Sequence, residues 1–163
     1  MAHSIDNLYR LLLLDLLSLN YKLLTHTNSN QMPDQSEHEQ QIDLTKTLLS
    51  VFNSWDIDPR DQIALLGLPE DTKPRMLNRF RAGMDIPNNP QFLQRAHYIL
   101  SISNAVDSLF PHNATAANYW VTTHSESFAK KSPLDIMLIH GVEGMEYILN
   151  LLNGEDEWGE KNP

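Results

Sequence analysis

Apolar residues recur every three or four positions along most of this chain, and no segment shows the alternation of a half-buried β-strand. Between residues 90 and 110, for example, Phe92, Ala96 and Ile99 begin a stripe that continues over about five helical turns. This periodicity predicts an all-α protein. Helices are expected over residues 5–24, 42–55, 58–66, 73–82, 90–110, 114–120 and 133–140, and from Met145 to Leu152.

Proline and glycine residues stand where these helices are expected to begin and end. Asp58-Pro59 and Ser132-Pro133 each place an N-cap residue before a first-turn proline, and Asp135 adds a negative charge near the second helix start. Single glycines such as Gly141 follow the expected last residues. Together these signals predict a compact helical bundle with a helix-turn-helix-like N-terminal part and a C-terminal helical hairpin.

The chain divides into three expected regions. Residues 1–41 hold an amphipathic, leucine-rich helix followed by a polar linker without apolar periodicity. Residues 42–110 are expected to form a helical core that includes the helix-turn-helix-like pair, and residues 111–163 a binding region with an acidic tail. The leucine stripe of the first helix must be covered, and self-association into a homo-oligomer is one way to cover it.

Composition limits the classes of protein that fit. The formal charge of -9 at pH 7 argues against binding nucleic acid through bulk charge. The chain has no cysteine, which excludes disulfides and thiolate zinc sites and fits a reducing cytoplasm. Arg10, Asp15 and Lys22 interrupt the leucine-rich start, which also lacks the flanks of a signal peptide. We therefore expect a cytoplasmic protein without a membrane anchor.

Residue combinations that could carry catalysis are weak in this sequence. His140, Glu143 and Glu146 have helical spacing, but Gly141 separates the histidine from both glutamates and no second histidine has the spacing of a metal site. Residues 124–127 contain suitable atoms for nucleophilic catalysis, yet neighbours in one loop cannot form a triad among themselves. Since no glycine-rich phosphate loop occurs either, we expect a protein that is not an enzyme and uses no metal or cofactor.

Positive charge is concentrated between residues 73 and 95, where five basic residues stand against one acid, Asp85. A helix-turn-helix outline leads into this segment, with its second helix placed as the reader of DNA. Operator DNA is therefore a candidate partner, with Lys73, Arg75, Arg79 and Arg81 as the candidate contacts. Alternatively, these side chains are solvated or paired with nearby acids such as Glu70 and Asp71. The sequence leaves both interpretations open.

Residues 42–158 also resemble the Xre/MbcA/ParS antitoxin family. The most specific stretch is an alanine-rich helix ending in Trp120, a polar loop, a helix start at Ser132, the break at Gly141 and a last helix before Trp158. The other matching positions are Trp55, Leu65, Leu66, Gly67, Leu68, Arg95, Phe110, Ala117, Pro133, Leu134, Asp135 and Met137.

The resemblance implies an antitoxin that neutralises a RES-domain toxin, an enzyme that consumes NAD. It implies docking of the C-terminal helix and tail at the entrance of the toxin active site, and in some members operator binding and dimerisation by the N-terminal helices. By position, the toxin-binding candidates lie in residues 125–131 and 141–158. The residues singled out are Trp120, Lys130, Lys131, Ser132, Asp135, Gly141, Glu143, Glu155, Asp156, Glu157 and Trp158.

Two other functions are compatible with the sequence. A transcriptional regulator would read DNA with the helix pair at residues 58–83. A lone family member without a toxin would act as an adaptor that associates with itself through residues 5–24. The acidic tail, which suits a basic enzyme cleft, favours the antitoxin hypothesis.

Overall fold

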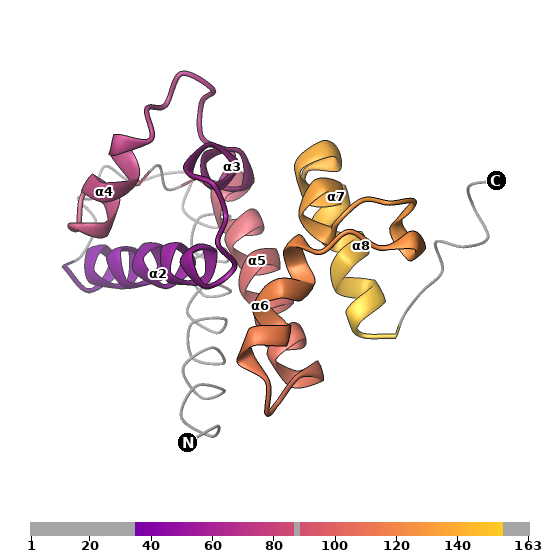
Figure 1. The fold of residues 1–163 in the computed structure, drawn as a ribbon. Coiled ribbons are helices and arrows are strands. Elements are labelled where there is room, and N and C mark those ends of the chain that lie inside the picture. Colours follow the sequence, from indigo (N-terminus) through magenta and orange to yellow (C-terminus); the bar gives the residue numbers. More distant parts are fainter. Residues whose placement is uncertain (1–34, 87–88, 155–163) are drawn as a thin grey trace.

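The computed structural model describes residues 35–86 and 89–154, and all regular elements in these ranges are helices (Figure 1). These ranges hold seven α-helices, one short 3-10 helix and no β-strand, so the predicted all-α class is confirmed. The helix expected at residues 5–24 lies outside the described residues. The elements are α2 (Gln35–Ser54), α3 (Pro59–Leu65), α4 (Arg75–Arg81), α5 (Pro90–Leu109), α6 (Ala114–Thr122), η1 (Glu126–Phe128), α7 (Pro133–His140) and α8 (Val142–Leu152).

Helix α5 forms the centre of the bundle (Figure 1). It contacts α2 on one side and α6 and α8 on the other, and α2 also packs against α4. Helix α7 packs against α8 as the predicted C-terminal hairpin. Because α7 also contacts α3, the two ends of the bundle meet directly as well as through α5.

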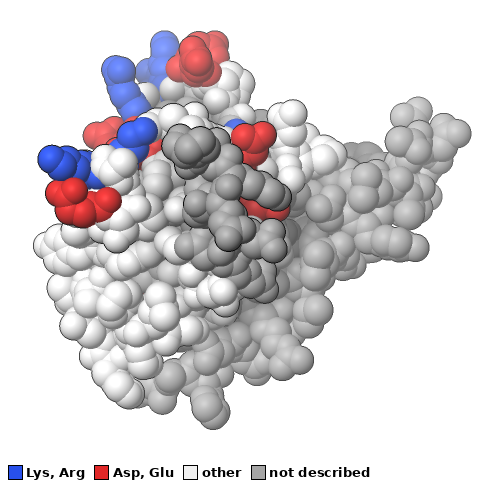
Figure 2. Space-filling model, turned by 90° about the vertical axis from the view of Figure 1, so that its right-hand side faces the viewer, with Lys and Arg blue, Asp and Glu red and all other residues white. Residues whose placement is uncertain are grey.

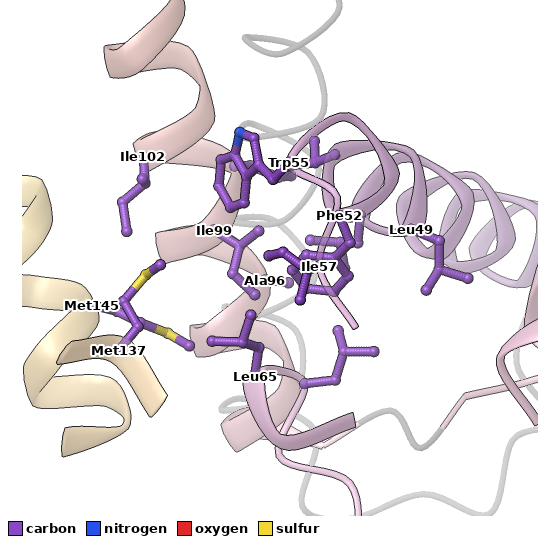
Figure 3. Packing of buried hydrophobic residues seen from close by; sticks show 14 of the residues in the cluster. Leu49, Phe52, Trp55, Ile57, Leu65, Ala96, Ile99, Ile102, Met137 and Met145 are labelled. Atoms are coloured by element: carbon purple, nitrogen blue, oxygen red, sulfur yellow. The ribbon is translucent and has the colours of Figure 1, made fainter. Parts of the chain in front are cut away.

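One continuous hydrophobic core fills the space between these helices. Trp55, just after α2, lies on one side of α5 beside Ile99, while Met137 of α7 and Met145 of α8 approach α5 from the other side (Figure 3). All four of these side chains are buried. The core therefore joins side chains from residues 42–110 to side chains from residues 111–163.

Polar side chains cap the starts of α3, α5, α6 and α7. Asp58 caps α3 and Ser132 caps α7, each directly before the proline that opens the helix, as the sequence predicts. Asn89 and Asn113 cap α5 and α6, and each accepts a hydrogen bond from the backbone N–H three residues further on. These contacts satisfy N–H groups that have no partner inside the helix.

The expected polar linker is wrong for residues 35–41, because they form the first turns of α2. Glutamate and glutamine in this segment are good helix formers although they create no apolar stripe. The side-chain amide of Gln41 also donates a hydrogen bond to the backbone oxygen of Ile86 at 2.7 Å. This contact with a segment distant in sequence ties the start of α2 to the chain just before α5.

The connection between α3 and α4 is longer than the expected tight turn. It covers residues 66–74, nine in all, whereas helix-turn-helix motifs join their helices by about three or four residues. The expected start of α4 at Lys73 is also two residues early. Pro74 stands at the N-cap position and the helix begins at Arg75, which keeps the proline ring out of the helix interior.

Candidate partner-binding surface

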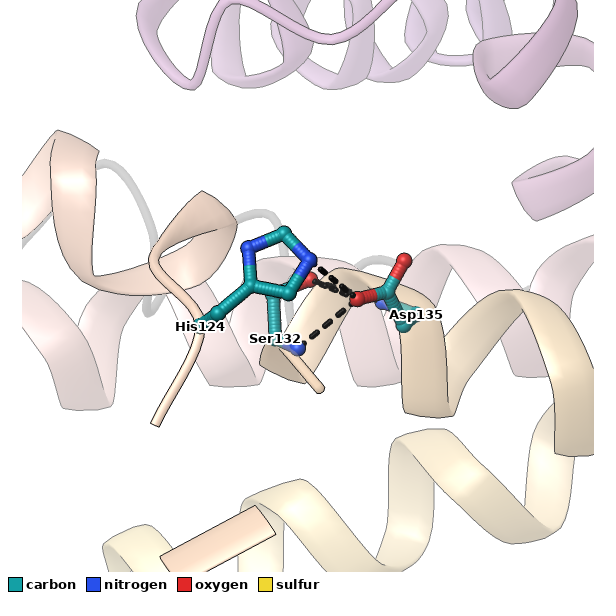
Figure 4. Close-up of polar contacts among 3 residues, drawn as sticks. All are labelled: His124, Ser132 and Asp135. Carbon is teal, nitrogen blue, oxygen red and sulfur yellow. Dashed lines mark hydrogen bonds and ion pairs between the residues drawn. The ribbon is translucent and has the colours of Figure 1, made fainter. Parts of the chain in front are cut away.

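A reciprocal capping box fixes the start of α7 (Figure 4). The Oγ of Ser132 accepts a hydrogen bond from the backbone N–H of Asp135 at 3.1 Å. In return, Oδ2 of Asp135 accepts hydrogen bonds from the backbone N–H and the hydroxyl of Ser132, both at 2.8 Å. Since Ser132 is only 2% exposed, it would influence a partner through the position of α7 rather than by direct contact.

The carboxylate of Asp135 also holds the loop that precedes α7. Nε2 of His124 lies 3.3 Å from Oδ2 of Asp135. The pKa of Asp135 is lowered, chiefly by the hydrogen bond from the Ser132 backbone; the Ser132 hydroxyl, His124 and Lys131 lower it further, while partial burial opposes them. Asp135 is therefore ionised at neutral pH and connects the two ends of the loop to the helix.

The loop at residues 125–131 is closed on itself in an uncommon conformation. The N–H of Ser125 donates to the backbone oxygen of Lys131 at 3.0 Å, and the N–H of Lys130 donates to the oxygen of Ser125 at 2.9 Å. Ala129 and Lys130 both have left-handed backbone, with φ of 53° and 66°. This conformation costs roughly 1–2 kcal/mol per residue without glycine. Such strain persists only where surrounding contacts enforce it, and it is frequent at binding sites.

Aromatic side chains attach this loop to α6. The ring of Phe128 contacts the ring of Trp120 edge-on, with centroids 6.3 Å apart and an interplanar angle of 81°. Both rings are half-buried, whereas the neighbouring Tyr119 is 66% exposed. Trp120 therefore supports the loop, while Tyr119 presents a large amphipathic side chain to solvent.

Helix α7 has more apolar surface than the bundle covers. Apolar residues surround nearly its whole circumference: Pro133 and Met137 are buried, Leu134, Ile136 and Leu138 are half-buried against the core, and Ile139 is 57% exposed. A helix that is apolar on all sides is normally enclosed. Ile139 and the partly exposed side chains around it are therefore apolar surface that a partner could cover.

Two glycines allow α7 and α8 to pack closely. Gly141 has φ of 60° and ψ of −130°, and it separates the two helices without any further loop. At Gly144, a Cβ atom would clash with the backbone oxygen of Ile136. Sequence reasoning missed Gly144 as a determinant of this joint. The three-residue spacing of Gly141 and Gly144 was the sequence signal that could have indicated close packing of the two helices.

The structure brings part of the predicted toxin-binding set together. Trp120, Ser132 and Asp135 build the framework of the loop, Gly141 is half-buried at the joint, and Lys130, Lys131 and Glu143 are exposed. Glu155, Asp156, Glu157 and Trp158 lie outside the described residues. Tyr119 and Ile139 were not predicted, because helical periodicity does not distinguish a covered apolar side from an uncovered one.

The basic cluster lies on α4 and just before it, in the part of the bundle away from α6 to α8 (Figure 1). Lys73, Arg75 and Arg79 are exposed. Arg81 is half-buried and donates hydrogen bonds to the side-chain oxygens of Asn78 at 2.8 Å and Asn53 at 3.1 Å. Arg81 therefore links α4 to α2, so we keep only the three exposed residues as candidate DNA contacts.

Charge is unevenly distributed over the side of the bundle formed by α6 to α8. Figure 2 shows charged side chains gathered in the upper part of this face, above a broad uncharged area. No Lys, Arg, Asp or Glu occurs between Asp107 and Glu126 or between Glu146 and Glu155. Helix α6 and the second half of α8 therefore present an uncharged surface.

Residues 35–86 and 89–154 contain no helix with the length and apolarity needed to cross a membrane. In the same ranges, no three His, Asp or Glu side chains are grouped as a metal site would require.

No protein-family model matches this chain, and no curated protein matches it.

Proposed function

We propose that this protein is an antitoxin-like binding protein that inhibits a RES-domain, NAD-consuming toxin by docking its C-terminal region at the toxin active-site entrance. The observation that carries the proposal is the closed, strained loop at residues 125–131, on a bundle that leaves Tyr119 and part of α7 uncovered. The class of toxin comes from the resemblance of residues 42–158 to the Xre/MbcA/ParS family.

The physical support for the proposal is that the loop at residues 125–131 is already held in one conformation before a partner binds. The capping box and His124 hold the loop at α7, and the contact between Phe128 and Trp120 holds it at α6. A loop held in this way loses few conformations on association, so more of the contact energy appears as affinity. Exposed Tyr119 would supply the aromatic area that dominates many interfaces.

Charge supports a role for the tail. Residues 155–163 contain four acids and one lysine. An enzyme that acts on NAD has to bind a pyrophosphate, which favours basic side chains in its cleft. An acidic segment entering such a cleft would be electrostatically complementary to it.

Co-expression with a RES-domain enzyme from the same genome, taken from the neighbouring reading frame where that frame encodes one, tests the proposal. The full chain should bind the enzyme and suppress its NAD consumption, and a chain ending at Gly154 should bind without full suppression. Tyr119→Asp combined with Ile139→Asp should weaken binding at least about tenfold, as expected for loss of central apolar contacts. Met84→Asp, at an exposed apolar residue between α4 and α5, is the matched control. A full chain that neither binds nor suppresses the enzyme would refute the inhibitory role.

A transcriptional regulator is the second candidate, and it is favoured by the exposure of Lys73, Arg75 and Arg79. Replacing all three by glutamate should abolish retention on the protein's own promoter and leave toxin binding intact. Arg81 is kept in this variant because its hydrogen bonds hold α4 to α2. A wild-type protein that shows no retention at low salt, where phosphate contacts are strongest, contradicts this candidate.

A further inference from the structure

An open hollow lies between the C-terminal parts of α5 and α8. Its volume is about 360 Å³, and none of the described residues that line it is charged. Leu109 of α5 and Leu149 and Leu152 of α8 are its large apolar lining residues, and Leu109 is 54% exposed. Asn104 and Asn153 add polar groups. The hollow thus combines an apolar surface with hydrogen-bonding side chains.

The chain leaves the bundle at this hollow. Asn153 is one of its lining residues, and Gly154 follows with φ of 74°, a left-handed conformation that turns the chain away from the helix axis. Trp158 stands five residues after Asn153. Since an extended chain spans about 3.3 Å per residue, these five residues reach about 16 Å. Every part of a hollow that begins at Asn153 is within that reach.

The chemistry of Trp158 matches the hollow. It is the single aromatic residue of the tail, and burying such a ring removes about 150–250 Å² from water. A buried indole N–H needs an acceptor, which the side-chain oxygens of Asn104 or Ser101 can provide. The acids beside the tryptophan would stay in water at the open side, and no charge among the described lining residues repels them.

The leucine stripe of residues 5–24 fits the hollow less well. A helix of that length extends about 30 Å. Among the described residues, the hollow is lined by residues within 101–109 of α5 and by Leu149, Leu152 and the C-cap residue Asn153 at the end of α8, which correspond to roughly two turns and one turn of helix. One aromatic side chain matches these dimensions, whereas the stripe would extend well beyond them.

We propose that Trp158 occupies the hollow between α5 and α8 in the free protein, so that the acidic tail folds back on its own bundle. The short tether gives the indole an effective concentration on the order of millimolar, so even a weak contact is populated. The consequence for regulation rests on the proposed function: a toxin that uses the tail has to displace Trp158 from the hollow first. Tail release would then be a step in inhibition.

Fluorine NMR on the full chain labelled with 5-fluorotryptophan tests this docking. The chain has three tryptophans, and Trp158→Phe assigns the resonance of the tail. In the wild-type protein, this resonance should differ from that of a labelled peptide of residues 155–163. Leu109→Asp should move the Trp158 resonance to the peptide position, because a carboxylate in the hollow disfavours burial of the indole. The fraction of molecules with Trp158 docked should fall from about half or more to below about one tenth. Met84→Asp, the same change at an exposed apolar residue remote in the fold, should leave it unmoved.

The result that overturns the docking is a wild-type Trp158 resonance at the peptide position, or one that ignores Leu109→Asp. A resonance that responds instead to Leu12→Asp assigns the contact to the first predicted helix and also overturns it. A Trp158 resonance that moves on about tenfold dilution assigns the contact to a second copy of the chain and overturns the docking as well. No toxin is present in these measurements, so their outcome is separate from that of the co-expression test.

Discussion

At the residue scale, Asp135 makes the contacts that hold the loop of the candidate surface to α7. One of its oxygens accepts two hydrogen bonds from Ser132 and lies beside His124. The residue therefore joins the loop before α7 to the helix itself. Its ionised form is the one that these contacts stabilise, which makes the contribution depend on pH.

Asp135→Asn is expected to lower the free energy of unfolding by about 1 kcal/mol at neutral pH, the usual effect of losing a helix-capping contact. The folded-state pKa of Asp135 is lowered. The stabilisation is therefore complete above the unfolded pKa of about 3.9 and is lost as the pH falls through the lower folded value. Urea unfolding across this range should show the difference between wild type and variant shrinking below about pH 4.

Asp61→Asn provides a contrast of opposite sign. The pKa of Asp61 is raised, first by burial and then by the charges of Asp58 and Asp135. Ionisation of Asp61 above its pKa therefore destabilises the folded state. The uncharged side chain of Asp61→Asn is expected to raise the free energy of unfolding at neutral pH. Equal destabilisation by both variants, at every pH, would contradict the assigned contacts.

At the element scale, the close approach of α7 and α8 determines the shape of the C-terminal part. Gly144 faces the backbone of Ile136 with no room for a side chain. The capping box of Ser132 and Asp135 determines where α7 begins, but it does not determine how closely α8 packs against α7. That spacing depends on a glycine in the interior of α8.

Gly144→Ala is expected to destabilise the protein by about 1–3 kcal/mol, because the added methyl overpacks the joint. The effect should appear although alanine is favoured over glycine inside a helix by about 1 kcal/mol. Thermal and urea unfolding measure it. Gly154→Ala is the matched variant: nothing lies near its Cβ position, and only the left-handed backbone should cost about 1 kcal/mol. A Gly144→Ala protein more stable than wild type would show that the helices can separate freely.

At the scale of the whole molecule, Arg95 of α5 connects the two ends of the bundle. Its guanidinium donates to the backbone oxygens of Ala64 at 3.3 Å and Leu65 at 3.2 Å, at the end of α3. A Cβ at Gly67 would lie 2.7 Å from its Nε, and one at Gly141 would lie 3.5 Å from its terminal nitrogen. Partial burial lowers the pKa of Arg95. Its positive charge also suits the C-terminal end of a helix.

Arg95→Gln should lower the free energy of unfolding by about 1.5–3 kcal/mol, since it removes hydrogen bonds made by a charged donor. Arg79→Gln, at an exposed arginine of α4, should change it by less than about 0.5 kcal/mol. Urea unfolding of both variants gives the comparison. Equal effects would mean that Arg95 does not connect the ends of the bundle.

Local signals predicted the starts of α3 and α7 well, and the candidate surface only in part. Asp58-Pro59 and Ser132-Pro133 act within one turn of helix, so the surrounding fold had little influence on them. The role of Arg81 could not be predicted, because its partner Asn53 is 28 positions away in the sequence. Tyr119 and Ile139 were missed for a related reason: their exposure depends on where the other helices lie.

The sequence by itself determined that this chain is helical, where most of its helices begin and end, and that Ser132 would cap α7 with Asp135 in its first turn. These properties follow from interactions over three or four residues. Only the tertiary structure decided that residues 35–41 join α2, that α7 keeps an uncovered apolar side, and that the candidate surface centres on the closed loop at residues 125–131. Those outcomes depend on contacts between segments far apart in the chain, which no local pattern records.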